Sequence, residues 1–246
     1  GANQWRTFED WPPRELESRS LYFHVDEGLS FRAPLNLKEV WDEYVSDPNE
    51  PVPYTQDITT GMTREYMTDD QRFAARRPDV LAYQTDVLAE DITIAGPIVA
   101  DLWVSTSGTA SDWIVKLIDV LPDTARDHDG LPRGMRMGGY QMMVRSEVIR
   151  GRFRNSYEHP EPFVPNEPTN VSFELQDVLH TFQQGHRIMV QIQSTWFPLV
   201  DRNPQQYVDN IFEAKEKDFI KATQRVYRSR RHPSRLQVGI LPNGGE

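Results

Sequence analysis

Most of the chain from residue 20 onward alternates apolar and polar positions with a period of two. β-Branched and aromatic residues occupy the apolar positions and turn formers separate the segments, a pattern typical of half-buried strands. The first such pair, Leu21 to Val25 and Leu29 to Phe31, flanks an acidic-glycine turn and predicts a hairpin. Further segments bring the expected total to about eight or nine strands: Ile92–Ile94, Ile98–Thr106, Trp113–Leu121, Tyr140–Ile149, Val171–Leu175 and Arg187–Gln193.

Two long irregular connections, residues 47–77 and 122–139, separate these strands. Loops of this length are uncommon unless they are functional or pack on a partner. Helical periodicity is sparse and is clearest in DNIFEAKEKDFIKATQRV, residues 209–226, which predicts one surface helix. The pattern favours an all-β fold, a jelly-roll β-sandwich with one or two short helices and long loops, over an α/β sheet.

Length and charge narrow the function classes. The 246 residues suffice for one large β domain, with two small domains as the alternative. A formal charge of −10 opposes sequence-independent binding to nucleic acid or to an anionic membrane. The absence of cysteine excludes disulfides and thiolate chemistry but leaves the compartment open. Because the chain begins without methionine, we expect a piece of a longer protein, a processed start being the alternative.

The stretch GHRIMVQIQSTWFPLVDRNPQ, residues 185–205, holds the three residue types of a hydrolase triad, in His186, Ser194 and Asp201. An α/β-hydrolase nucleophile requires a G-x-S-x-G elbow, and the nearest approach, GLSFR at residues 28–32, ends in arginine. We therefore interpret Ser194 as a core or ladder serine. The stretch is predicted to be a strand with Ile188, Val190 and Ile192 facing the core, and with Trp196 and Phe197 anchoring its end.

The residue pattern gives little support for a metal-binding or a sugar-binding site. The six histidines show no H-x-x-x-H or H-x-H spacing, and we expect no metal site or cofactor. A weak calcium site around His128, between Asp127 and Asp129, is an open alternative. Six tryptophans allow an autonomous carbohydrate-binding jelly-roll module, although aromatic residues are equally expected in a large β core. The residues alone do not identify the function of the sandwich.

Several stretches, read in order, carry a family resemblance. They are GANQWRTFEDWPP, YVSDPNEPVPY, DDQRFAARRPDVLAYQTDVLAEDITIAGPIVADLWVSTSGTASDWIVKLIDVLPD, GGYQMMVRSEVIRGRFRNS and FQQGHRIMVQIQSTWFPLVDRNPQ. Together they resemble the C-terminal domain of the X-Pro dipeptidyl-peptidase and cocaine esterase (CocE/NonD) family of serine hydrolases. Within it the likeness is strongest to the α-amino acid ester hydrolases and glutaryl-cephalosporin acylase-like enzymes. The resemblance spans nearly the whole chain.

This resemblance implies a domain plan. Residues 1–19 would be the tail of an upstream α/β-hydrolase domain with a linker, and residues 20–246 a jelly-roll domain of the galactose-binding-like kind. The family's catalytic triad would lie upstream of Gly1, so no catalytic residue is expected in this chain. Expected partners are the hydrolase and cap domains of the same protein, and homo-oligomers occur among relatives. The parent would be an acylase, ester hydrolase or X-Pro dipeptidyl-peptidase, and export in that branch favours a periplasmic or secreted location.

The resemblance also implies a position for one loop. In relatives the loop after a DP-x-x-PVP turn reaches toward the active site and helps wall the acyl pocket. Here the turn is Asp47 to Pro53 and the loop is TTGMTREYMTDDQR, residues 59–72. Met62, Tyr66 and Met67 are its apolar candidates for the pocket wall, and methionine suits a pocket that accepts varied side chains. An interdomain packing loop is the alternative interpretation.

Overall fold

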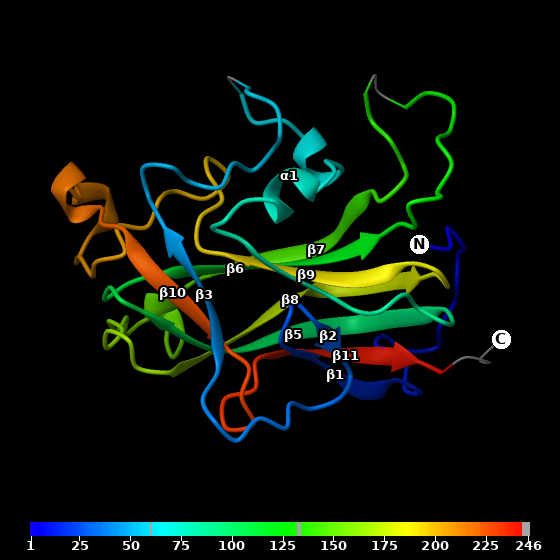
Figure 1. Ribbon diagram of the computed structural model, residues 1–246, viewed down its shortest axis with the longest axis horizontal. Coiled ribbons are helices and arrows are strands. Elements are labelled where there is room, and N and C mark those ends of the chain that lie inside the picture. Colours follow the sequence, from blue (N-terminus) through cyan, green and yellow to red (C-terminus); the bar gives the residue numbers. More distant parts are fainter. Residues whose placement is uncertain (60, 132–133, 243–246) are drawn as a thin grey trace.

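The computed structural model describes residues 1–59, 61–131 and 134–242. Within them the strands form two antiparallel sheets that pack face to face (Figure 1). Sheet A has seven strands in the order β2-β1-β11-β5-β10-β3, with β8 also paired to β5, and sheet B has four in the order β4-β9-β6-β7. The strands of sheet A are β1 Glu17–Phe23, β2 Leu29–Ser30, β3 Trp41–Ser46, β5 Ile92–Thr106, β8 Thr169–Phe182, β10 Ala222–Tyr227 and β11 Arg235–Leu241. Those of sheet B are β4 Leu81–Gln84, β6 Asp112–Val120, β7 Gln141–Arg150 and β9 Arg187–Gln193.

Helical structure is limited to short pieces in the described part of the chain. The helix α1 spans Arg72–Ala75, and the 3₁₀ turns are Glu65–Met67, Gly151–Phe153, Ile211–Glu213 and Glu216–Asp218. No described helix is both long and apolar enough to cross a membrane. The predicted all-β sandwich, with short helices and long loops, is confirmed.

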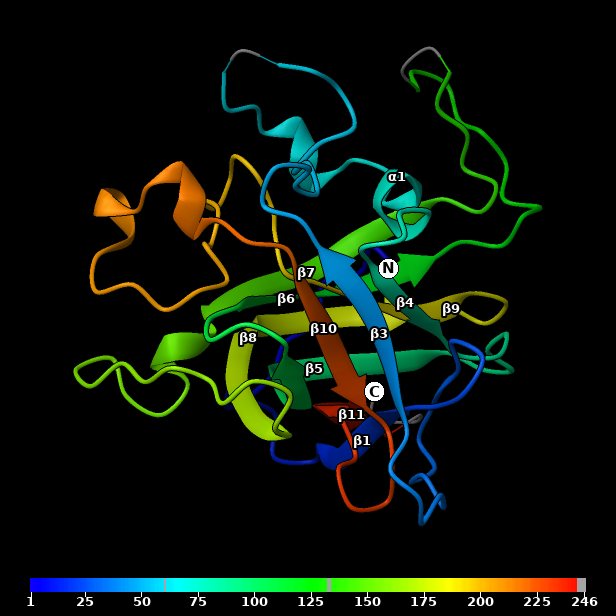
Figure 2. The same ribbon diagram turned by 60° about the vertical axis from the view of Figure 1, so that its left-hand side comes forward.

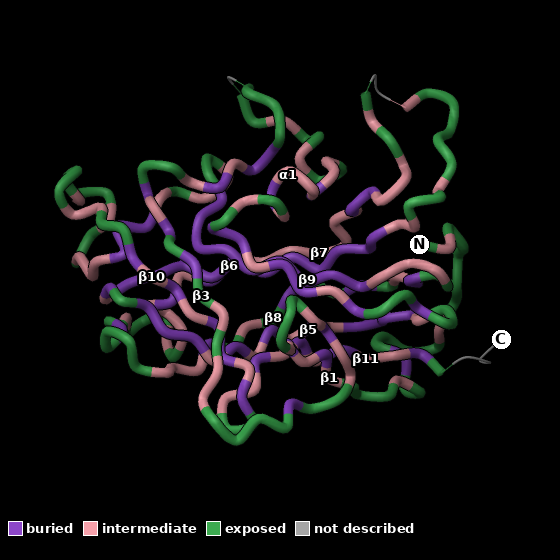
Figure 3. The backbone as a smooth tube through the Cα atoms, viewed as in Figure 1, coloured by how far each residue is buried: buried purple, intermediate pink, exposed green. Residues whose placement is uncertain are grey.

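The main core lies between the two sheets and follows the period-two pattern. Leu21 and Phe23 of β1 are fully buried there, as are Ile188, Val190 and Ile192 of β9. Figure 3 shows that buried residues concentrate in the two sheets and exposed residues in the loops. Each such side chain contributes roughly 1.5–3 kcal/mol on burial. The inward-facing positions predicted for the 188–192 stretch are confirmed.

The longest strand, β5, changes register part-way along at Gly96. Its pairing with β8 shifts between Gly96 and Ile98. Gly96 has φ of +79°, a conformation that residues with a Cβ avoid, and Pro97 lacks the N–H that an unbroken ladder requires. This bulge lets one strand pair with β8 along one edge and with β11 and β10 along the other. Figure 2 shows β3 and β10 side by side, steeply inclined to β5.

Strand β6 is buried on both faces, which is the feature that places the site. Val115 and Leu117 face the main core. Ile114 and Ile118 point to the opposite side and join two further apolar clusters. This second side, called here the outer face of sheet B, is covered by the connection between β3 and β4 rather than by solvent.

The sequence pattern missed four strands, β3, β4, β10 and β11, and the surface helix predicted for residues 209–226 is wrong. That stretch forms two 3₁₀ turns followed by β10, which pairs with both β3 and β5. Phe212, one of the residues at helical spacing, is 88% exposed, so no apolar helix face packs on the body. Short helices are marginal without such packing, and strand pairing takes the remaining residues instead.

Candidate functional site

The connection between β3 and β4 is fastened at both ends to sheet B and the segment that follows it. At its start, Tyr54 N donates to Phe197 O and Phe197 N donates to Val52 O, each over 2.9 Å. At its far end, Gln71 N donates to Gln141 O on β7 over 3.0 Å. Residues 59–70 lie between these attachments and, with Gln71 and Arg72, are called here the 59–72 loop. Figure 1 shows the connection rising above β6, β7 and β9.

Arg72 ties this loop to the second long connection, residues 122–139. Its Nη1 donates to Gly138 O over 3.0 Å and its Nη2 to Arg136 O over 3.2 Å. The carboxylate of Asp70 pairs with the same guanidinium and accepts from Arg72 Nε over 2.6 Å. The two loops predicted to be functional or to pack on a partner are therefore joined at their bases.

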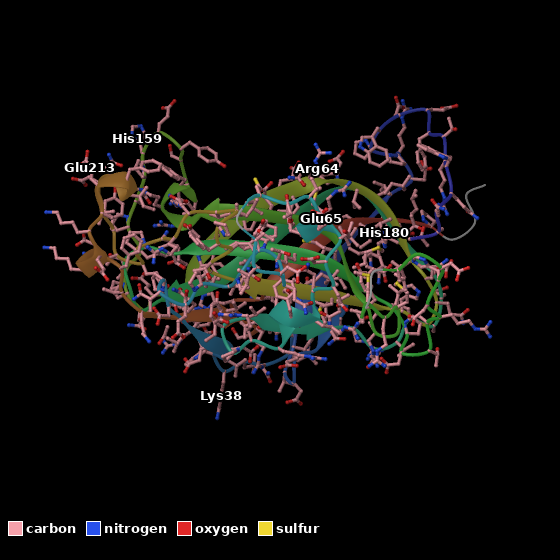
Figure 4. All side chains as sticks on the ribbon, turned by 90° about the horizontal axis from the view of Figure 1, so that it is seen from above. Lys38, Arg64, Glu65, His159, His180 and Glu213 are labelled. Carbon is pink, nitrogen blue, oxygen red and sulfur yellow. The ribbon has the colours of Figure 1, made fainter. Side chains whose placement is uncertain are left out.

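Aromatic rings support the middle of the 59–72 loop. Tyr66 lies 5.5 Å from Tyr54 and 6.0 Å from Trp196 between ring centroids. Trp196 is only 4% exposed and packs on Ile114 of β6. The hydroxyl of Tyr54 accepts from Thr63 N over 3.1 Å, which fixes the loop backbone above these rings. In Figure 4, Arg64 and Glu65 lie over the middle of the molecule, away from His159 and Glu213 at one end.

Beneath the loop lies a lysine that is fully buried. The Nζ of Lys116 on β6 donates to Gln71 Oε1 over 3.0 Å and sits 4.8 Å from the centroid of the Trp196 ring. Burial lowers the pKa of Lys116 to about 7. No carboxylate within the described residues forms an ion pair with this amine. A buried lysine of this kind readily loses its proton near neutral pH.

The structure brings two of the three predicted pocket residues together and places the third beside them. Tyr66 and Met67 line a shallow groove of about 500 Å³ whose other wall includes Met143 and Trp196. Met62 is 74% exposed and lines a smaller hollow of about 170 Å³ with Tyr54. Leu199 lines both hollows, so they adjoin on the same face. The role of Met62, Tyr66 and Met67 as a pocket wall stays a prediction.

Sequence reasoning missed other residues of this face. Met143, Leu199 and Trp196 line the groove although none was proposed for it. Met143 lies on the outer face with Val148, but the pairing of β6 with β7 shifts between Leu117 and Ile118, so alternation counted from the core residue Ile149 would have placed it in the core. Leu199 lies outside any strand, and its place depends on a contact between segments far apart in the sequence.

The apparent triad at residues 185–205 is dispersed among three networks. Ser194 is buried and shares a hydrogen bond of 2.7 Å with the hydroxyl of Tyr44. Asp201 pairs with Arg150. His186 precedes β9 and Ser194 follows it, so the rise of the strand separates them by roughly 25 Å. The interpretation of this stretch as scaffold is therefore supported by its geometry.

His186 contributes instead to a clasp between the sheets. Its Nδ1 lies 2.7 Å from Asp119 Oδ1, and His180 Nε2 from β8 lies 2.8 Å from Asp119 Oδ2. Burial acts to raise the pKa of Asp119, but hydrogen bonds from the two imidazoles hold that pKa below its ordinary value. The carboxylate is thus ionised and joins β6 of sheet B to β8 of sheet A.

Among the described residues, no group of side chains supports the calcium or the sugar alternative. The Asp127 carboxylate accepts from Met137 N over 2.8 Å, and across residues 1–59, 61–131 and 134–242 no three potential metal ligands of the His, Cys, Asp or Glu type gather. Trp113 and Trp196 are buried and cannot stack on a sugar, while Trp5 lies in the N-terminal segment and is fully exposed. Trp113 and Trp196 are therefore not available to a sugar-binding platform.

Comparison with known proteins identifies the relatives of this sandwich. The model of the X-Pro dipeptidyl-peptidase C-terminal non-catalytic domain family matches residues 1–237. The chain is 28% identical over 248 residues to cocaine esterase from Rhodococcus sp. (strain MB1 Bresler), covering 98% of this chain and 40% of that enzyme. It is 25% identical over 256 residues to a putative serine esterase of Mycobacterium bovis (strain ATCC BAA-935 / AF2122/97), covering 97% of this chain and 36% of that protein. It therefore spans about two fifths of the length of these curated relatives.

Solved structures extend the likeness to three dimensions. An aminopeptidase from the marine sediment archaeon Thaumarchaeota archaeon superposes with a TM-score of 0.90 at 44% identity, over 98% of this chain and 39% of that one. An α-amino acid ester hydrolase superposes with a TM-score of 0.84 at 45% identity, over 91% of this chain and 36% of that one. These relatives are larger enzymes. Since the family model covers nearly all of the sandwich, this chain belongs to the X-Pro dipeptidyl-peptidase C-terminal non-catalytic domain family.

Proposed function

We propose that this chain serves a serine hydrolase that acts on ester or amide bonds, by packing on its catalytic domain and walling the acyl pocket with the 59–72 loop. The relatives named above include an esterase, an aminopeptidase and an α-amino acid ester hydrolase, each of which is more than twice as long as this chain. In such an enzyme the acyl group would pass to a serine of the catalytic domain. This chain would contribute shape and exclusion of water rather than a reacting group.

The observation that carries the proposal is an anchored loop with an exposed apolar tip. Tyr54 and Trp196 are buried beneath the loop, whereas Met62 is 74% exposed, Met67 is 47% exposed, and Ile58 just before the loop is fully exposed. Clusters of exposed apolar side chains mark interaction or ligand surfaces. A loop that is held on sheet B and exposes methionines in the isolated chain is suited to face a second domain.

The N-terminal segment supports the same arrangement. Residues 1–16 form no strand or helix, and β1 begins at Glu17. Trp5 is fully exposed and Trp11 is 45% exposed. We propose that residues 1–19 are the tail of the catalytic domain and its linker, with Trp5 inserted into that domain.

Substitution in the full-length parent tests the pocket role. Met62→Ala and Met67→Ala should each lower kcat/KM for the parent's ester substrate by about tenfold, because a lost apolar contact in a pocket costs discrimination of this order. Phe212→Ala is the matched control, since Phe212 is also exposed but lies on a 3₁₀ turn outside both hollows. Unchanged kcat/KM in both methionine variants would refute the pocket role.

The isolated chain provides a second test. We expect no turnover of p-nitrophenyl esters or amino acid methyl esters, because the apparent triad residues lie in separate hydrogen-bond networks. Turnover that survives repurification would contradict the assignment of chemistry to another domain. Light scattering of the parent would show whether it forms the homo-oligomer that the resemblance suggests.

A further inference from the structure

The Lys116 amine contacts the 59–72 loop at two separate points. It donates to the side chain of Gln71, next to the last residue of the loop, over 3.0 Å. It also lies under the ring of Trp196, which in turn meets Tyr66 in the middle of the loop. A single buried group therefore supports both the end and the centre of the loop.

The amine lies in surroundings that suit its neutral form. A charged ammonium offers three donors, and in this arrangement only Gln71 Oε1 accepts from it. Gln191, the cross-strand neighbour of Lys116 on β9, has its own Oε1 without a partner, and so has Gln193. Neither of these oxygens accepts a hydrogen bond from the amine, which donates to Gln71. Burial alone lowers the pKa of Lys116 to about 7.

Charged groups on the neighbouring elements are engaged elsewhere. In the loop, Asp70 pairs with Arg72, and Asp69 accepts from Thr55. The hydroxyl of Tyr140, before β7, donates to Thr68 O. Those on β7 and in the segment after β9 also have partners: Arg145 donates to Asp177 O, Glu147 accepts from Gln176, and Asp201 pairs with Arg150. On β9, Gln191 and Gln193 share this face with Arg187, whose Nη1 donates to Thr85 O over 2.7 Å.

We propose that Lys116 is the positioning residue of the 59–72 loop, and that the loop stays seated while the amine is neutral and loosens when the amine takes up a proton. One consequence rests on the proposed function: in the parent, the pocket wall would be better ordered in mildly alkaline than in acidic solution. The seating itself belongs to this chain and is measured without any catalytic domain.

Proton linkage sets the expected size of the effect. When the loop lifts, water reaches the amine and its proton affinity returns to that of an ordinary lysine, with a pKa near 10.5. Between roughly pH 10 and pH 7, the Lys116 amine is therefore protonated in the open form and neutral in the closed form. The population of the open loop should rise up to about tenfold for each pH unit lowered across this window, and level off below about pH 7.

The test combines two measurements on the full 246-residue chain. Lysine labelled with ¹³C at Cε gives few NMR signals, because the chain has five lysines, and loss of one signal in Lys116→Met assigns it. That signal should titrate near pH 7 in the wild-type chain. Hydrogen–deuterium exchange of peptides from residues 61–71, corrected for intrinsic rates between pH 6 and 9, should show protection that falls toward pH 7.

Variants separate the amine from other causes. Lys116→Met should abolish the pH dependence of the corrected exchange. Lys221→Met is the matched control, because Lys221 is 67% exposed and pairs with Asp47, and it should keep the wild-type profile. If Lys116→Met fails to fold, single substitutions of the other four lysines assign the remaining signal to Lys116, and titration of that signal near pH 10 would overturn the proposal. An unchanged exchange profile in a folded Lys116→Met chain would overturn it equally. Activity assays with the Met62 and Met67 variants fail or succeed independently of both outcomes.

Discussion

The ring of Tyr66 stands edge-on to the indole of Trp196, with 6.0 Å between the ring centroids and 80° between the ring planes. Trp196 is 4% exposed and joins the loop above to Ile114 below. Trp196→Ala should therefore lower the free energy of unfolding by about 3–5 kcal/mol, as is typical of deleting a buried ring. Urea denaturation measures it, and Phe197→Ala, at a neighbouring site that is 41% exposed, should cost far less. Equal losses would show that Trp196 is not an anchor.

Ser194 is expected to matter for stability and not for chemistry. Ser194→Ala leaves the buried hydroxyl of Tyr44 without its 2.7 Å partner, which should cost about 1–3 kcal/mol. Turnover by the full-length parent should stay nearly intact. A thousandfold loss of turnover with folding preserved would mean that the assignment of Ser194 to the scaffold is mistaken.

Asp119 should make the chain sensitive to acid. Its pKa in the folded chain lies below the ordinary value of 3.8, so the ionised carboxylate adds stability above about pH 4 and this contribution is lost as the pH falls through the folded-state value. Asp119→Asn should cost about 1–3 kcal/mol at pH 7, because one hydrogen bond to the imidazoles is lost. Urea unfolding between pH 3 and 7 should show the two chains converging at the acidic end. Asp129→Asn, in the exposed loop, is the control, and a constant difference across this range would contradict the clasp.

Two glycines offer a matched pair for testing backbone packing. A Cβ at Gly108 would lie 2.0 Å from the carbonyl oxygen of Gln205, whereas a Cβ at Gly61 would meet nothing within 4 Å. Backbone cannot yield as a side-chain tip can, so Gly108→Ala should destabilise by about 1–3 kcal/mol or more. Gly61→Ala should leave the melting temperature nearly unchanged. Similar melting temperatures for both variants would refute the close approach of residues 108 and 205.

Local alternation predicts the strands whose two sides differ in polarity, and it fails where burial comes from distant segments. Ile188, Val190 and Ile192 were assigned correctly because their neighbours differ from them in polarity. Lys116 and Gln191 would be placed in solvent by the same rule, yet both are fully buried. The group that covers Lys116 is Gln71, 45 residues away in the sequence, and no local window contains that contact.

The stretch before β10 illustrates the opposite failure. Ile211, Phe212 and Phe219 recur at helical spacing, but a helix is stabilised mainly by packing of its apolar side. Here Asn210 caps only a 3₁₀ turn, and the strand that follows gains hydrogen bonds on both edges. Tertiary pairing therefore decides the structure against the local preference.

The candidate site was predictable in part. Tyr66 and Met67 were named from the resemblance, and the structure places them in one groove. Trp196 was named only as an anchor, although it forms the floor of that groove. Trp196 acts both as anchor and as part of the groove because the chain after β9 passes beneath the 59–72 loop. That path can be known only from the topology.

Because β6 is buried on both faces, the loop positions that cover it should tolerate fewer substitutions than the exposed positions. Side chains that close the outer face of sheet B, such as Tyr54 and Gln71, are coupled to the sandwich, and changes there would spread into the fold. Met62 and Met67 are 74% and 47% exposed, so substitutions there remove less buried surface. The pocket role proposed for Met62 and Met67 predicts that a library restricted to these positions would change the acyl preference of the parent with little loss of soluble protein, whereas a library that included the anchors would lose most of its members to misfolding.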